Sequence, residues 1–240
     1  MLFSSRLSLL LVTALLLPLL TTGQDEKAEK PARPLVTKIG ENSYRLGEIL
    51  FDSKEKKIEI PVVVNMNEGG PIEYLLVNEN GKVHEAIFTT TISPSELQIV
   101  LKLLKFESGH GDVFNRLLAP EVLDKEGGTE AERGDAMEFL FVEEGKDPRP
   151  GYEFIIDGEN AEPMAPGDWI YTGSTIEEGN FLAEGEGSII AIYLDHIAMF
   201  NMTRDGADID ERWGANGDAI PEIGTKGTLI LKASKKPVTN

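Results

Sequence analysis

Cysteine is absent from the 240 residues, so the chain has no disulfides and no thiolate or Cys-ligated metal chemistry. Its stability must therefore come from packing alone. Basic residues are also scarce, because 23 Lys and Arg stand against 41 Asp and Glu, a formal net charge of −18. The longest basic cluster, Lys54-Glu55-Lys56-Lys57, is too small to offset this excess. Such a surface repels polyanions, and the sequence therefore argues against nucleic acid as a partner.

Long apolar runs are missing as well, apart from the uncharged, leucine-rich stretch from Leu7 to Leu20 that follows the single cation Arg6. Its roughly 14 residues fall short of the roughly 20 that a membrane-crossing helix needs, and they suit the core of a secretion signal. Thr21-Thr22-Gly23 offers small residues to a signal peptidase. We predict a signal peptide over residues 1–23, cleaved near Gly23. The alternative is an uncleaved N-terminal anchor.

The remainder divides into two parts. Residues 24–34 read QDEKAEKPARP, a charged, proline-containing stretch without apolar periodicity, which predicts a disordered linker. Residues 35–235 are long enough for one substantial core and show no second linker. We therefore expect a single globular domain that is exported to the periplasm or the cell exterior, with no transmembrane segment in the mature chain and a net charge of −19 once Arg6 is removed.

Short strand-like runs separated by glycine and proline recur along this domain. They cover residues 57–64, 137–142, 152–156, 169–172, 180–183, 189–194 and 228–231. Pro61 in the first run suggests an edge position or a bulge. The spacing predicts a β-rich α+β fold, with a mostly antiparallel sheet and one main amphipathic helix at about residues 94–106.

A hairpin and this helix are the sharpest local predictions. Asn80-Gly81 separates two strand-like runs, which predicts a tight turn with Val77 opposite His84. Ser93-Pro94-Ser95-Glu96 then has an N-cap serine, a proline at the first helical position and a glutamate three residues after the cap. Leu97, Val100, Leu101 and Leu104 recur at helical spacing, and Ile99, Leu103 and Phe106 widen this stripe, so we expect the helix to be covered on more than one face.

The stretch GGPIEYLLVNENGKVHEAIFTTTISPSELQIVLKLL (69–104) resembles the YdjY-domain proteins, in which a strand leads into Gly-Lys-x-His-Glu, a further strand and a proline-initiated helix. WIYTGS (169–174), FLAEGEGSIIAIY (181–193) and AIPEIGTKGTLILK (219–232) follow in the order of that family, so the similarity spans about residues 36–233. The resemblance implies an exported bacterial protein and supplies no catalytic residues. The acidic insertion over residues 121–135 departs from the family pattern.

Two pairs of histidine and acid, His84-Glu85 and Asp195-His196, invite a catalytic or metal-binding interpretation, because imidazole and carboxylate carry protons and ligate metals. Neighbouring side chains of a strand point to opposite faces, so neither pair can act on one ion unless a bulge intervenes. We retain His84, Glu85, Glu73, Asp195 and His196 as candidate catalytic residues that would act with groups from other strands. The alternative is a His84 that hydrogen-bonds locally.

Four carboxylates lie within seven residues and are candidate calcium ligands: Asp205, Asp208, Asp210 and Glu211. The EF-hand spacing is absent, and the alternative is a solvated acidic loop. A three-histidine zinc site would also require His110, and it is not expected.

No set of residues has the convergent geometry that catalysis requires. The function expected is a non-enzymatic module of the bacterial cell envelope that binds a small ligand, a glycan or an envelope protein and uses no cofactor. The alternatives are a carboxylate- and His-dependent extracytoplasmic enzyme, a metal-binding protein, or a structural envelope component.

Overall fold

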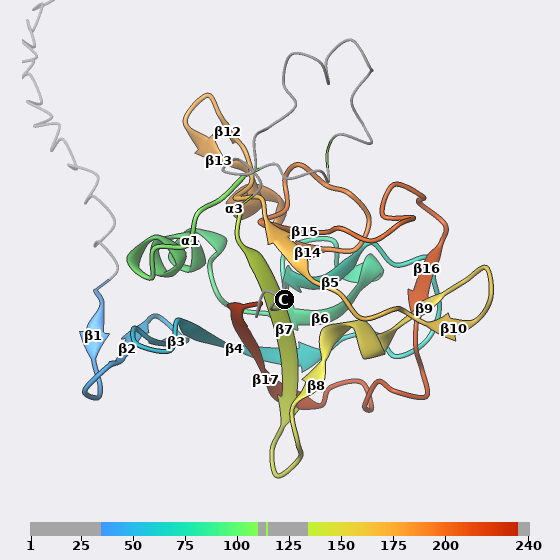
Figure 1. Cartoon of the computed structure of the whole chain (residues 1–240), viewed down its shortest axis with the longest axis horizontal. Coiled ribbons are helices and arrows are strands. Elements are labelled where there is room, and N and C mark those ends of the chain that lie inside the picture. Colours follow the sequence, from blue (N-terminus) through green and yellow to red (C-terminus); the bar gives the residue numbers. More distant parts are fainter. Residues whose placement is uncertain (1–34, 110–113, 115–133, 235–240) are drawn as a thin grey trace, which may run out of the picture. The chain divides into compact units, whose positions relative to one another are not determined.

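Strands from distant parts of the sequence close into a ring. The computed structural model describes residues 35–109, 114 and 134–234. Eight strands follow one another as neighbours in the order β4, β17, β7, β11, β15, β14, β5 and β6, and β6 pairs with β4 to complete a barrel. Figure 1 shows α1 and the β1–β3 extension on one side of this ring and the small β9, β10 and β16 sheet on the other.

The strands are β1 (Thr37–Lys38), β2 (Ser43–Leu46), β3 (Ile49–Asp52), β4 (Lys57–Val64), β5 (Tyr74–Asn78), β6 (Ala86–Thr90), β7 (Ala136–Glu143), β8 (Arg149–Pro150), β9 (Ile155–Asp157), β10 (Glu162–Pro163), β11 (Trp169–Tyr171), β12 (Ile176–Glu177), β13 (Asn180–Phe181), β14 (Ser188–Ala191), β15 (Phe200–Met202), β16 (Trp213–Ala215) and β17 (Lys226–Ala233). The helices are α1 (Pro94–Leu103) and α3 (Leu182–Glu186), with 3₁₀ turns η1 (Val83–Glu85) and η4 (Gly151–Phe154).

The expected β-rich α+β class is confirmed, since strand accounts for 38% of the described residues and helix for 13%. The sheet mixes both directions, because β5–β6 and β14–β15 run parallel while the other pairs of the ring run antiparallel. The described residues all belong to one compact unit. The predicted signal peptide, the predicted linker and all but the last two residues of the acidic insertion lie outside the described residues.

The predicted hairpin at Asn80-Gly81 is wrong. A tight two-residue hairpin turn of this type needs positive φ at both central residues, and neither Asn80 nor Gly81 has one. Gly81 instead allows close backbone approach, since a Cβ there would lie 3.2 Å from the Cα of Gly187. The chain then returns through η1, and β6 starts beside the start of β5, with Ala86 level with Tyr74. The two strands are therefore parallel neighbours.

Helix α1 starts as predicted and ends earlier. The Ser93 hydroxyl accepts a hydrogen bond from the Glu96 N–H at 3.3 Å, which is the expected N-cap. Leu97, Val100, Leu101 and Leu104 are buried. The expectation of a helix covered on more than one face is wrong, because Ile99 and Leu103 are 37% and 52% exposed.

Two strand predictions also need correction. The run 152–156 opens as η4 and becomes a strand only at Ile155. The run 180–183 ends in α3, whose Glu184 carboxylate accepts hydrogen bonds from the Ser93 hydroxyl and the Ser95 N–H at the start of α1. This contact with α1 stabilises a short helix where local sequence favoured a strand.

Pro61 lies inside the barrel wall at a point where strand β4 changes partner. On one side β4 pairs with β17 along its whole length, and on the other it pairs with β3 up to Glu59 and with β6 from Val63. The proline therefore occupies a local edge between two partners, as its missing N–H requires. Its carbonyl accepts a hydrogen bond from the Thr90 hydroxyl at 2.7 Å.

Aromatic side chains fill the barrel interior. Phe88 stacks on Phe141 with ring centroids 4.8 Å apart, and Phe154 meets both rings edge-on. Trp169 is buried beside Phe139 and donates its indole N–H to the carbonyl of Ala191 at 3.1 Å. Among the described helices, none has the length and apolar character needed to cross a membrane.

Candidate functional site

The parallel pairing of β5 and β6 brings two carboxylates together. Glu73 immediately precedes β5 and Glu85 immediately precedes β6, and the Glu73 N–H donates to the Glu85 carbonyl at 3.0 Å. In the predicted hairpin these residues would lie several positions apart. The strand direction, which the sequence pattern missed, therefore creates the pair.

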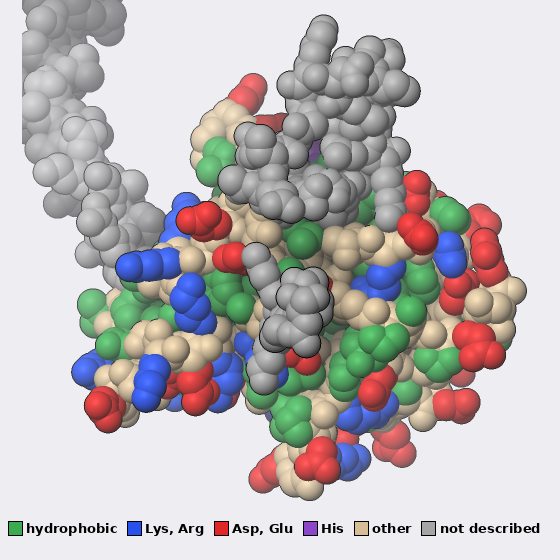
Figure 2. Space-filling view, viewed as in Figure 1, with side chains coloured by type: hydrophobic (Ala, Val, Ile, Leu, Met, Phe, Trp, Pro, Cys, Tyr) green, Lys and Arg blue, Asp and Glu red, His purple; other side chains and the backbone are tan. Residues whose placement is uncertain are grey.

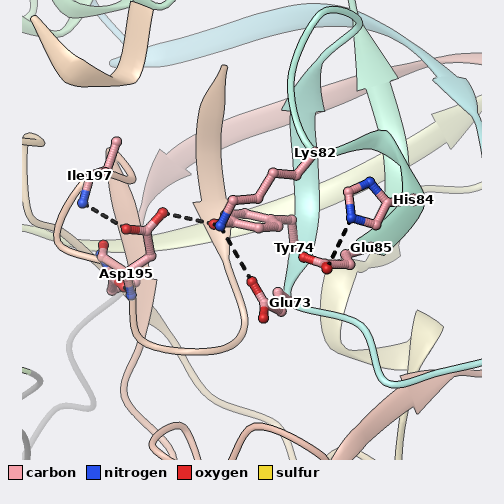
Figure 3. Close-up of polar contacts among 8 residues, drawn as sticks. Glu73, Tyr74, Lys82, His84, Glu85, Asp195 and Ile197 are labelled. Atoms are coloured by element: carbon pink, nitrogen blue, oxygen red, sulfur yellow. Dashed lines mark hydrogen bonds and ion pairs between the residues drawn. The ribbon is translucent and has the colours of Figure 1, made fainter. Parts of the chain in front are cut away.

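The hydroxyl of Tyr74 joins this pair to a third carboxylate. It donates to Asp195 Oδ2 at 2.8 Å and accepts from Lys82 Nζ at 3.0 Å. Lys82 Nζ also lies 3.6 Å from Glu73 Oε2 and 5.2 Å from the centre of the Tyr74 ring. Figure 3 shows the Lys82 ammonium group between the Tyr74 hydroxyl and Glu73. We call Glu73, Tyr74, Lys82, Glu85 and Asp195 the acidic network.

A buried amide holds Asp195 in place. Asn201 is fully buried in β15; its Oδ1 accepts from the Asp195 N–H at 2.8 Å, and its Nδ2 donates to the Asp195 carbonyl at 2.9 Å. Asp195 Oδ1 accepts the N–H of Ile197 at 2.8 Å, which leaves Oδ2 for Tyr74. Position and orientation of this carboxylate are thus determined by backbone contacts at the ends of β14 and β15.

The acidic network has more negative than positive charge. Burial raises the pKa of Glu73 above its ordinary value, and the neighbouring Glu85 and the charge of Asp210 raise it further, against the opposing effect of Lys82. Burial and the Asp195 charge raise the pKa of Tyr74 to about 12, so the phenol stays protonated. Burial opposes the charged form of Lys82, but the contacts with Tyr74, Glu73 and Asp195 outweigh it and raise the pKa of that ammonium group.

Of the five candidate catalytic residues, the structure brings three into the acidic network: Glu73, Glu85 and Asp195. His84 lies beside them, with its Nε2 3.1 Å from Glu85 Oε1, although its side chain is 74% exposed. This contact is possible because residues 84 and 85 form a 3₁₀ turn rather than the expected strand. The His196 side chain is exposed, and its carbonyl accepts from the Thr175 hydroxyl at 3.2 Å.

The four calcium candidates form an exposed acidic loop. Asp205, Asp208, Asp210 and Glu211 are all exposed, and Asp210 is near enough to Glu73 to raise the pKa of that carboxyl. Within residues 35–109, 114 and 134–234, no three His, Asp or Glu side chains gather in a way that could hold a metal ion. His110 lies outside the described residues.

Sequence reasoning missed Tyr74 and Lys82, the two residues that connect the carboxylates. A signal for the first was present, because a tyrosine in an otherwise aliphatic, buried run needs a partner for its hydroxyl. Lys82 belongs to the Gly-Lys-x-His-Glu stretch of the resemblance, but nothing in its local sequence indicates contacts with carboxylates. Two surface hollows of the described chain lie elsewhere, one beside β1–β4 and one between β7 and Ala219-Ile220-Pro221, and no residue of the acidic network lines either.

Comparison with known proteins adds no relative: no family model matches the chain, and no curated protein or solved structure does so.

Proposed function

We propose that the chain is an exported, YdjY-like, non-enzymatic module of the bacterial cell envelope that binds a cationic group of its partner at the acidic network. The resemblance over residues 36–233 and the N-terminal signal motif support the class and the location. The charge of the acidic network supports the chemistry of the partner, because the network as defined has three carboxylates and one cation, Lys82.

The raised pKa of Glu73 is the observation that carries this proposal. A carboxyl whose pKa is raised by burial and by other carboxylates is short of compensating positive charge. A bound ammonium or guanidinium group supplies that charge, and by linkage it binds more tightly as Glu73 loses its proton. The strongly acidic chain also attracts cationic partners over longer distances.

Calorimetric titration with a short oligolysine peptide tests the site. An exposed ion pair contributes up to about 1 kcal/mol, so Glu73→Gln or Glu85→Gln should weaken binding by up to about fivefold. Added salt should weaken binding of the unsubstituted protein. Export is tested separately, by sequencing the amino terminus of protein recovered from the periplasm, where we expect a start near Gln24.

The matched control is Glu177→Gln, which removes the same charge from the exposed strand β12. This variant should bind the peptide as the parent does. If all three variants lose affinity equally, net charge alone governs binding and the acidic network is not the site.

A second candidate function, an extracytoplasmic enzyme or metal-binding protein that uses carboxylates and histidine, is favoured by one contact. A proton could pass along the side chains from Glu73 through Glu85 to the exposed His84, although these three do not gather as a set of metal ligands. Metal analysis of protein purified without chelators tests the metal-binding form, for which stoichiometric zinc that is lost in His84→Ala is the expected result.

A further inference from the structure

Apolar side chains are exposed at the open end of the main sheet. Strand β1 is the last strand of the sheet order, and among the described strands it pairs only with β2. Around it Leu35 is 82% exposed, Ile39 is 51% exposed and Val36 is 37% exposed. Long apolar side chains beside an unpaired strand edge are a template for pairing with another chain, and proteins usually cover or charge such edges.

The backbone of β1 leaves hydrogen-bonding groups on that edge. The Ile39 N–H donates to the Ser43 carbonyl at 2.9 Å, and Thr37 faces Arg45. Because alternate residues of an antiparallel strand bond to the same neighbour, Thr37 and Ile39 turn their groups toward β2. The N–H and carbonyl of Lys38 therefore point away from β2, toward the open side.

A hollow next to this edge could receive an apolar side chain. It is lined on the apolar side by Ile39, Tyr44, Leu50 and Phe51, and Tyr44 stacks on Phe51 with ring centroids 5.4 Å apart. Exposed apolar side chains and an apolar hollow thus lie together on one sheet edge. A second copy of the same chain, turned by a two-fold axis, would place the exposed side chains of each copy against the hollow of the other.

The charge distribution favours self-association here and opposes it elsewhere. Residues 35–57 have five Lys and Arg against four Asp and Glu, whereas residues 134–234 have six against twenty-one. Figure 2 shows blue and green side chains gathered around α1 and β1–β3 on the left, and red ones over β9, β10 and β16 on the right. Two copies of so acidic a chain meet with less electrostatic repulsion through residues 35–57 than through residues 134–234.

We propose that the β1 edge is a homodimer interface, formed by antiparallel pairing of β1 with β1 of a second copy, with Leu35 and Ile39 packed across the two-fold axis. This interface is separate from the acidic network. It leaves the proposed cation-binding site open in each copy.

Light scattering after size-exclusion chromatography, on processed protein recovered from the periplasm, tests this interface. At about 100 µM, where a contact with a micromolar Kd is saturated, the parent should have twice the molar mass of one chain. Ile39→Asp should raise the dimer Kd by at least about tenfold, since it places two unpaired charges in the interface. Ile176→Asp is the control, because Ile176 is 62% exposed on the distant strand β12, and it should leave the dimer intact.

Lys38→Pro separates strand pairing from apolar contact. The proline removes an N–H that the monomer does not use, so the monomer should fold normally, as checked by circular dichroism. The dimer should be lost. A parent that remains monomeric at about 100 µM, or a dimer that survives both Ile39→Asp and Lys38→Pro, overturns the proposal.

Discussion

Tyr74→Phe removes one oxygen atom from the centre of the acidic network and leaves the buried ring in place. The lost hydroxyl makes two hydrogen bonds to charged groups, one to Asp195 and one from Lys82. Hydrogen bonds to charged groups contribute about 1.5–3 kcal/mol each. The two lost hydrogen bonds differ in cost, because Lys82 and Asp195 differ in the hydrogen-bond partners that they keep.

Lys82 keeps Glu73 as a partner, and its side chain is 42% exposed, so water replaces the phenol at little cost. Asp195 keeps the Ile197 N–H on Oδ1, but its Oδ2 loses its donor in a half-buried position. We therefore expect the free energy of unfolding to fall by about 2 kcal/mol, the contribution of one charged hydrogen bond. For a domain of about 200 residues this lowers Tm by roughly 4–8 °C.

Urea unfolding followed by tryptophan fluorescence measures the change, with Tyr44→Phe as the matched control. Tyr44 stacks on Phe51, and its hydroxyl makes no hydrogen bond within the described part of the chain, so the same substitution there should cost under about 0.5 kcal/mol. Combining Tyr74→Phe with Asp195→Asn should cost less than the sum of the single changes. Equal stability of the two phenylalanine variants would refute the role assigned to the Tyr74 hydroxyl.

Three further changes probe local parts of the structure. Ser93→Ala removes the N-cap acceptor of the Glu96 N–H and should lower the free energy of unfolding by about 1 kcal/mol, measured by urea denaturation. Glu73→Gln should reduce the pH dependence of stability. Because the pKa of Glu73 is raised, the folded state holds this proton more tightly than the unfolded state, and the stability of the parent falls as pH rises from the ordinary to the raised pKa. Thermal melts across that pH range should show this fall in the parent alone. Arg212→Ala leaves the buried Asp157 carboxylate without its cation and should cost about 2 kcal/mol at neutral pH. Arg212 lowers the pKa of Asp157. The cost of the substitution should therefore shrink in melts below that lowered pKa, where Asp157 is protonated in both the parent and the variant.

Local signals predicted α1 well. An N-cap serine, a proline and the spacing of Leu97 and Leu101 all act within a few residues, and the structure confirms each of them. The same kind of reasoning failed for Ile99 and Leu103, since helical spacing places both beside the buried stripe but cannot tell how far the neighbouring sheet extends. Whether a residue at the margin of the apolar stripe is exposed depends on the elements packed against the helix rather than on the helix itself.

The candidate site was only partly predictable, for a related reason. Glu73, Glu85 and Asp195 were among the candidate residues, yet the meeting of Glu73 with Glu85 requires that β5 and β6 run parallel. Asn80-Gly81 favours a hairpin when it is considered alone, but neither residue has a positive φ and the chain returns through η1 to a parallel strand. Lys82 reaches the carboxylates for the same reason, because the chain returns through η1 instead of forming a hairpin.

The sequence alone establishes the absence of disulfides, the excess of negative charge, the strand-rich composition and the start of α1. Each of these depends on residue content or on contacts within one turn. The closure of eight strands into a ring, the direction of β6 and the meeting of Tyr74 with Asp195 were decided by the tertiary structure. Pairing between strands is a long-range choice, in which the burial of both faces and the contacts of the connecting turn outweigh the local preference of a single dipeptide.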